Sequence, residues 1–262
     1  MLVFKGVVHL HSTYSHDATL SLPTVRDLLK GRGYHFGLMA EHHEDLDEGT
    51  LAEFIDACAD LSDEGFLLIP GIEFHTRCLA ACGVTMPAAF GPGEAERLAN
   101  CYTEGTFNVL VHPSGVASLP DVALLRKVDA VEVWNVKADG GRYPAGRRIA
   151  LWKRLRREYD VHPVVGIDLH DESQLASVHV RLTLPELTTP AVLSAMKAGD
   201  YRLYHGDRVC PVDVLPFGMK LGMLGNGVMR TTAGGLRRML GWALPRGLRK
   251  RIRMRLDGVK RA

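Results

Sequence analysis

Short apolar runs alternate with longer amphipathic segments along most of this chain. The apolar runs predict β-strands at 3–9, 36–40, 66–70, 107–111, 129–134, 162–167 and 178–184, with a further strand or hairpin around 78–84. Apolar positions at helical spacing predict helices at 23–30, 50–63, 94–102, 121–127, 145–159 and 190–199. Strands that alternate with helices are typical of parallel β/α units, and seven of them favour a barrel over an open sheet.

Residues that can bind a metal stand where several of these apolar runs end. His9 and His11 close the first run, and their spacing of two points both imidazoles to the same side of a strand. Later runs end in Glu41, His42 and His43, in Glu73, in His112, and in Asp168 and His170. Buried ionisable side chains are costly unless they are paired or bound to a metal. We therefore interpret these strand ends as one multinuclear metal site.

The chemistry of this ligand set predicts a hydrolase. Imidazole and carboxylate ligands suit Zn, Mn or Fe, and a carboxylate that bridges two ions holds them about 3.5–4 Å apart. Water that bridges two such ions loses a proton near neutral pH and becomes the nucleophile, while the ions stabilise the phosphoryl oxygens. No serine or cysteine nucleophile is needed.

Seven short motifs occur in order over residues 1 to about 205. They are His9-Leu10-His11, Asp17, Glu41-His42, Pro70-Gly71-Ile72-Glu73, Val111-His112-Pro113, Val131-Glu132-Val133-Trp134-Asn135 and Gly166-Ile167-Asp168-Leu169-His170. Together they resemble the PHP (polymerase and histidinol phosphatase) family of metal-dependent phosphoesterases. The resemblance implies a distorted (β/α)7 TIM-like barrel that carries two or three Zn, Mn or Fe ions at the C-terminal ends of its strands.

The resemblance also implies a ligand set. His9, His11, Glu73 and Asp168 would hold one ion, Glu73 would bridge to a second ion bound by His112, and Asp17, His42 and His170 would hold a third. Asp168, His170 and Glu73 are assigned catalytic roles as well. The sequence departs from the family at Glu41, where Asp is usual, and after the fifth strand, where Asn135 to Asp139 include no histidine. The second ion then has few ligands, so a site with two strongly held ions is an alternative.

For other polar residues near these motifs, the sequence indicates a role less specifically. Arg77, Lys137 and Arg142 follow ligand strands and are candidates to bind substrate phosphate, with a solvated loop position as the alternative. His16 is an alternative to Asp17 as a ligand. His75 is expected to support the site by hydrogen bonding, whereas Glu132 either supports a ligand in the same way or anchors a buried polar contact.

Composition agrees with a soluble globular enzyme. The chain has 262 residues, of which 46% are hydrophobic and 24% are charged. Five cysteines without a CxxC pair argue against a disulfide framework or a cysteine-based zinc site. The N-terminus lacks the pattern of a signal peptide, and no run approaches about 18 apolar residues, so we expect a cytoplasmic protein.

The net charge of +2 conceals a basic C-terminal segment. Residues 230–262 carry eleven Lys or Arg and one Asp. We divide the chain into a metallohydrolase barrel at 1–210 and a basic extension at 211–262, whose two short amphipathic helices are separated at Pro245. The extension is expected to pack on the barrel or to bind an anionic membrane surface through residues 230–262, at the inner membrane face. Nucleic acid is a third alternative.

The leading prediction is a metal-dependent hydrolase that cleaves a phosphomonoester or phosphodiester of a small phosphorylated molecule. One alternative is hydrolysis of a non-phosphate ester, amide or carbamate on the same metal cluster. Another is a non-catalytic metal-binding regulatory module at a membrane. The nearly complete ligand set favours an enzyme, because a structural role does not require an open water position between metals.

Overall fold

The structure is a computed structural model that describes residues 1–86, 91, 93–113, 119–212 and 223. The chain divides into two compact units, Met1–Pro216 and Phe217–Ala262. Only residue 223 of the second unit is described, so the predicted basic helices lie outside the described residues. The predicted domain boundary at residue 210 stays a prediction.

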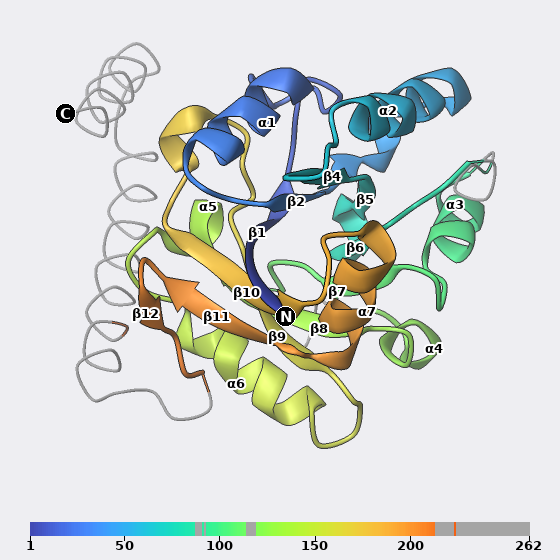
Figure 1. The fold of residues 1–262 in the computed structure, drawn as a ribbon. Coiled ribbons are helices and arrows are strands. Elements are labelled where there is room, and N and C mark those ends of the chain that lie inside the picture. Colours follow the sequence, from blue (N-terminus) through green and yellow to red (C-terminus); the bar gives the residue numbers. More distant parts are fainter. Residues whose placement is uncertain (87–90, 92, 114–118, 213–222, 224–262) are drawn as a thin grey trace, which may run out of the picture. The chain divides into compact units, whose positions relative to one another are not determined.

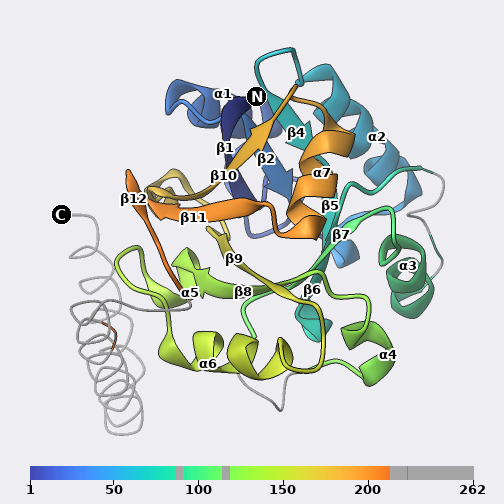
Figure 2. The same ribbon diagram turned by 60° about the horizontal axis from the view of Figure 1, so that its bottom comes forward.

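The described strands form two mixed sheets of six strands each (Figure 1 and, turned by 60°, Figure 2). In spatial order the first sheet contains β12 (Arg208–Val209), β11 (Tyr201–His205), β10 (Val178–Leu184), β1 (Leu2–Leu10), β2 (Phe36–Met39) and β4 (Leu67–Ile69). The second sheet contains β3 (Glu41–His42), β5 (Gly71–Phe74), β6 (Leu79–Cys82), β7 (Phe107–Leu110), β8 (Ala130–Asn135) and β9 (His162–Gly166). The predicted α/β class is thus confirmed.

A closed barrel of seven parallel strands is not confirmed, because the described strands divide between these two sheets. The hairpin predicted around 78–84 is confirmed, because β6 runs antiparallel to β5 and also to β7. The prediction of parallel units is wrong at β10, which runs antiparallel to β1. Only four residues connect β5 to β6, and so short a connection permits an antiparallel pair but not a parallel crossover.

The two sheets meet along the strands that carry the candidate ligands. A single residue separates β2 from β3, and a single residue separates β4 from β5, so these strands run from one sheet into the other. Beyond β9, the Asp168 N–H donates to the His9 carbonyl at 2.8 Å, and the His11 N–H donates to the Leu169 carbonyl at 3.0 Å. These bonds fix the end of β1 beside the segment that follows β9.

Helices flank the sheets (Figure 1). α1 contacts β2, α2 contacts β4, α6 contacts β8, and α7 contacts both β7 and β10. The α-helices are α1 (Leu22–Gly31), α2 (Glu48–Asp60), α3 (Glu94–Cys101), α4 (Val122–Leu125), α5 (Val136–Asp139), α6 (Gly146–Leu155) and α7 (Thr189–Ala198). All six predicted helices are present, although α4 is shorter than expected, and α5 was not predicted. None of the helices in the described part of the chain is both long enough and apolar enough to span a membrane.

Local sequence explains where the first helix begins and what it buries. The Ser21 hydroxyl accepts the Thr24 N–H and caps α1, and Pro23 follows in the first turn, where its missing N–H costs nothing. Val25 and Leu29, four residues apart, lie on one face and are fully buried. The segment that leads from the first ligand strand into α1 is therefore held at both ends.

Gly71 provides a test of the junction between the sheets. A Cβ atom at this position would lie 2.1 Å from the Met39 carbonyl oxygen, and neither backbone can yield without shifting a strand. We expect Gly71→Ala to lower the free energy of unfolding by about 1–3 kcal/mol in urea denaturation. Gly31→Ala is the matched control, because nothing lies within 4 Å of its added Cβ atom and alanine favours a helix. Equal stabilities of the two variants would contradict the close approach at Gly71.

Candidate metal centre

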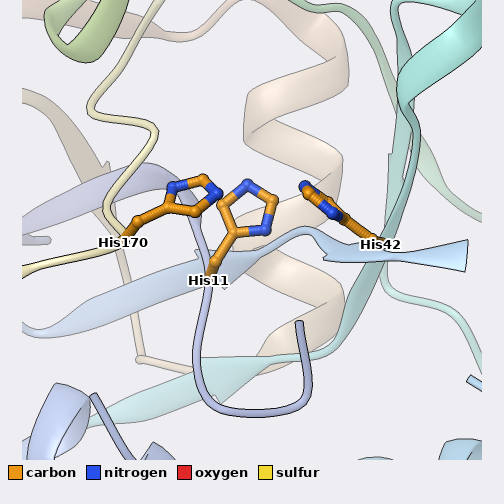
Figure 3. Close-up of side chains that lie close together, drawn as sticks. All are labelled: His11, His42 and His170. Carbon is orange, nitrogen blue, oxygen red and sulfur yellow. The ribbon is translucent and has the colours of Figure 1, made fainter. Parts of the chain in front are cut away.

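Five strands bring the predicted ligands into one cluster. His9 lies near the end of β1, His42 ends β3, and Glu73 lies in β5. His11 follows β1, His112 follows β7, and Asp168 and His170 follow β9. Figure 3 shows the rings of His11, His42 and His170 turned toward one another, and the ring centroids of His11 and His170 are 4.1 Å apart.

Backbone conformation at the ligands is strained. Four non-glycine residues in the described part of the chain have positive φ angles, namely His9 (68°), Cys78 (54°), His112 (29°) and Asp168 (57°). Such conformations cost about 1–3 kcal/mol each and persist where the surroundings hold them, often at functional sites. The pairing of β1 with β2 also shifts register between Val8 and Leu10. The direction of His9 therefore comes from a bulge, and not from the simple strand alternation that the sequence suggested.

The distances around Glu73 match the spacing of ligands on a shared ion. Glu73 Oε2 lies 3.4 Å from both His9 Nε2 and His11 Nε2, and 3.5 Å from His42 Nε2. Asp168 Oδ1 lies 3.6 Å from His11 Nε2. These distances are longer than those of charge-assisted hydrogen bonds. Two ligand atoms bound tetrahedrally to one ion at 2.0–2.1 Å lie about 3.3 Å apart, which is close to the observed values.

The second oxygen of Glu73 faces a different pair of histidines. Glu73 Oε1 lies 2.7 Å from His112 Nε2 and 3.9 Å from His75 Nδ1. The carboxylate is almost completely buried. One carboxylate thus presents each of its oxygens to a separate set of imidazoles, which is the arrangement of a residue that bridges two ions.

Hydrogen bonds outside the cluster fix which imidazole nitrogen faces inward. His9 Nδ1 lies 3.0 Å from Glu132 Oε1, and His11 Nδ1 lies 3.3 Å from Ser15 Oγ. Because the His11 Nδ1–H donates to Ser15 Oγ, His11 Nε2 keeps its lone pair for the centre of the cluster. His11 Nε2 is buried and has no hydrogen-bond partner among the described residues. A buried acceptor without a donor is costly, and a divalent ion at this point satisfies it.

Glu41 organises the loop that supports these ligands. Its Oε1 accepts the Ser12 N–H at 2.8 Å and the Ser12 hydroxyl at 2.6 Å, while its Oε2 accepts the Ser15 hydroxyl at 2.5 Å. Ser15 Oγ in turn accepts the His42 N–H at 3.0 Å. Burial raises the pKa of Glu41 to about 7, although the serines oppose that rise. The residue therefore supports His11 and His42 indirectly.

Electrostatics in the cluster favour bound cations. Burial acts to raise the pKa of Glu73, but His9 and a hydrogen bond from His112 hold it well below its ordinary value. Burial acts to lower the pKa of His112, but hydrogen bonds to Cys78 and Glu73 raise it to about 10. Burial and the nearby His9 hold the pKa of His11 well below its ordinary value, which leaves a neutral imidazole. Ionised Glu73 and neutral His11 are thus in the state that binds metal, whereas an ion would have to displace a proton from His112.

A third group contains Asp17, His42 and His170. His170 Nε2 lies 3.0 Å from Asp17 Oδ1, and His42 Nδ1 lies 3.8 Å from the same oxygen. Lys137 enters this group, with Nζ at 3.0 Å from His170 Nε2 and 3.5 Å from Asp168 Oδ1. The side chains of Asp17 and Lys137 are more than a third exposed, so the cluster has a buried floor and an open rim.

Potential ligand atoms form five groups. In each group, all the atoms lie within 4.8 Å of one another. The groups are His9, His11 and Glu73; His9, His112 and Asp168; His11, His42 and His170; Glu73, His75 and His112; and His16, His42 and Asp45. With Asp17 beside His170, the structure brings together all eight ligands predicted from the sequence. Their donor atoms are those that bind divalent metal ions.

The predicted phosphate-binding residues have different positions. Lys137 lies in the cluster, whereas the Arg77 guanidinium bonds to Glu94 at 3.1 Å. Arg142 is exposed in the loop before α6. His16, the alternative ligand, bonds through Nδ1 to Asp45 at 2.8 Å.

Sequence reasoning left Glu132 undecided and missed its buried partners. Glu132 Oε2 accepts the Asn135 amide at 3.0 Å and lies 3.7 Å from the Arg148 guanidinium. Asn135 also donates to Asp168 Oδ2 at 3.1 Å. Of the two readings of Glu132, the structure shows support of a ligand. Arg148 belongs to a helix rich in basic residues, so no local pattern distinguishes it from its exposed neighbours.

Comparisons with solved structures agree with this fold. The chain is similar to the crystal structure of a two-domain protein from Bacteroides vulgatus that contains a predicted PHP-like metal-dependent phosphoesterase. The identity is 18% and the TM-score 0.57, over 79% of this chain and 66% of that one. PsfC from Pseudomonas syringae is also 18% identical, with a TM-score of 0.53 over 89% of this chain and 100% of PsfC. No family model and no curated protein matches the chain.

At 18% identity these likenesses concern the fold alone. The resemblance to PHP proteins that the motifs indicated is confirmed at that level. The chain spans just under two thirds of the Bacteroides protein, which has a further domain.

Glu132→Gln tests whether the outer hydrogen bonds set metal affinity. We expect the affinity for zinc or manganese to fall by about 10–100-fold with the fold retained, because an amide holds the His9 Nδ1–H less firmly than a carboxylate. Isothermal titration calorimetry measures this. Asp129→Asn is the matched control, since this carboxylate binds Lys197 and the Asn108 N–H and belongs to none of the groups of potential ligands. Wild-type affinity in Glu132→Gln would contradict the role assigned to this residue.

Proposed function

We propose that the protein is a metal-dependent hydrolase that cleaves a phosphomonoester or phosphodiester of a small molecule. The observation that carries this proposal is the position of Glu73, whose two oxygens face separate sets of imidazoles. The buried Nε2 lone pair of His11 supports it. The similarity of the fold to a protein that contains a predicted PHP-like phosphoesterase adds further support.

Each group of ligands has a proposed ion. His9, His11, Glu73 and Asp168 would hold the first, Glu73 and His112 the second, and Asp17, His42 and His170 the third. Two or three bound Zn, Mn or Fe ions supply Lewis-acid stabilisation of phosphoryl oxygens and lower the pKa of water. With this cluster at the strand ends, we also propose that the two sheets together form the distorted (β/α)7 barrel. The hydrogen bonds from the Asp168 N–H to the His9 carbonyl and from the His11 N–H to the Leu169 carbonyl support that arrangement.

The residues at the buried floor and at the exposed rim of the cluster have different proposed roles. The floor, formed by His9, His11 and Glu73, is almost inaccessible to solvent and excludes water from behind the reacting group. On the rim, the Lys137 ammonium is placed to bind a phosphoryl oxygen, and Asp168 is placed to accept a proton. His170 lies 3.2 Å from Asp168 and fixes its direction.

Arg77 and Arg142 remain proposed contacts to substrate phosphate at the edge of the site. Arg77 would exchange Glu94 for the substrate, and Arg142 is already exposed. A planar guanidinium suits the two oxygens of a phosphate group. We further propose that the enzyme acts in the cytoplasm.

Asp168→Asn tests the proposed chemistry. We expect this variant to lose hydrolysis while it keeps its fold, because an amide has the shape of the carboxylate but neither its charge nor its ability to accept a proton. Metal-reconstituted wild-type and variant proteins are assayed against nucleotides, sugar phosphates, phosphopeptides and a phosphodiester, with circular dichroism as the control for folding. Full turnover by a folded Asp168→Asn variant would contradict the assigned role.

The same screen, extended to carboxylic esters, amides and carbamates, separates the alternatives. Turnover of one of those substrates without phosphoester cleavage would indicate a metallohydrolase of another class instead of a phosphoesterase. Tight metal binding without any turnover would favour the non-catalytic regulatory module.

A separate proposal concerns residues 230–262, which lie outside the described residues. We propose that they bind an anionic membrane surface, because each Lys or Arg near such a surface contributes about 1 kcal/mol. Deletion of 230–262 is expected to abolish co-sedimentation with anionic liposomes at low salt and to leave hydrolysis and metal binding intact. Liposomes of neutral lipid are the control. If the full-length protein ignores anionic liposomes and the deletion unfolds the protein, the segment packs on the barrel instead.

A further inference from the structure

The proposed second ion has too few ligands in the set taken from the sequence. Glu73 and His112 alone contact it, whereas catalytic zinc sites usually have three protein ligands and an open position. The family resemblance implies a histidine after the fifth strand, where this chain has Asn135. That side chain is fully engaged, since its amide donates to Glu132 and Asp168 and its oxygen accepts the Ala138 N–H at 2.7 Å. Asn135 therefore does not replace the missing ligand.

His75 lies on the open side of the same pair. It follows β5 directly and begins the short 3-10 helix η2 (His75–Arg77), two residues after Glu73. Its Nδ1 lies 3.9 Å from Glu73 Oε1, and its ring centroid is 5.9 Å from that of His112. Ligand atoms of Glu73, His75 and His112 all lie within 4.8 Å of one another. The distance of 3.9 Å exceeds a hydrogen bond, so the supporting hydrogen bond expected from the sequence is not formed.

Contacts on its C-terminal side fix the direction of the turn that carries His75. The Thr76 hydroxyl and the Arg77 guanidinium both donate to Glu94, at 2.8 and 3.1 Å. The Cys78 N–H donates to the His75 carbonyl at 3.2 Å, and Cys78 adopts a left-handed conformation. The turn is thus anchored next to His75, while the imidazole itself is 62% exposed and forms no hydrogen bond to the described residues. Packing does not explain why this imidazole faces Glu73.

We propose that His75 is the third protein ligand of the second ion, together with Glu73 and His112. The inference rests on the proposed metal centre and deepens it. Two imidazoles and one carboxylate form a donor set of catalytic zinc, and the exposure of His75 places this ion on the solvent side of the cluster. The second ion would then be accessible to solvent beside His75.

Counting ions in variants tests this proposal without reference to activity. Apoprotein is dialysed against buffered zinc or manganese, and ions per chain are measured by inductively coupled plasma mass spectrometry over a range of free metal concentrations. His75→Ala is expected to keep all but one ion with wild-type affinity. Half-filling the site of the remaining ion should need at least roughly 100-fold more free metal. The loss of a ligand lowers metal affinity by more than the loss of an outer hydrogen bond does. Thermal unfolding checks that the variant is folded.

His205→Ala is the matched control, because this imidazole lies beside Trp134 and belongs to none of the ligand groups. It should bind as many ions as the wild type. The assignment of His75 alone would be overturned if His75→Ala binds every ion with wild-type affinity, or loses no more metal than His205→Ala. A wild-type protein that binds no ion would overturn the proposed metal centre and this inference with it.

Discussion

The structure depends on the burial of the Glu73 carboxylate between two groups of histidines. A carboxylate removed from water costs several kcal/mol unless positive charge compensates it. Here that compensation comes from imidazoles on separate strands, with His112 on one oxygen and His9 on the other. The two sheets must therefore keep their strand ends at fixed distances around Glu73. The close backbone approach at Gly71, two residues earlier, serves the same requirement.

Backbone strain and outer hydrogen bonds act together on these ligands. His9, His112 and Asp168 occupy left-handed conformations that L-residues rarely adopt. Glu132 compensates at two of them, because it bonds the His9 ring and also accepts the His112 N–H at 2.5 Å. Arg148 lies against this carboxylate from α6. A site held in this way is preorganised, so little conformational freedom is lost when a ligand binds.

Much of the ligand set was predictable because each ligand follows an apolar run, and the end of a strand is a local property of the sequence. His9, His42, Glu73 and Asp168 were found in this way. Support of a ligand was one of two roles predicted for Glu132, but its partner was not predictable, since Glu132 meets His9 across 123 positions and no periodicity encodes that pairing. The antiparallel direction of β10 was missed for a related reason. Apolar runs predict strands but do not determine their direction, which depends on the lengths of their connections.

Lys137 connects the proposed third ion with the binding of substrate. Its ammonium lies 3.0 Å from His170 Nε2 and 3.7 Å from Asp17, so it contacts two of the ligands assigned to that ion. The lone pair of His170 Nε2 can serve either the ammonium or an ion, so an ion held by Asp17, His42 and His170 would displace Lys137 from His170. The displaced ammonium would stay at the exposed rim, where Coulomb attraction favours a phosphoryl oxygen as its next partner. In the proposed centre, competition between a metal and this lysine would then decide between two and three ions.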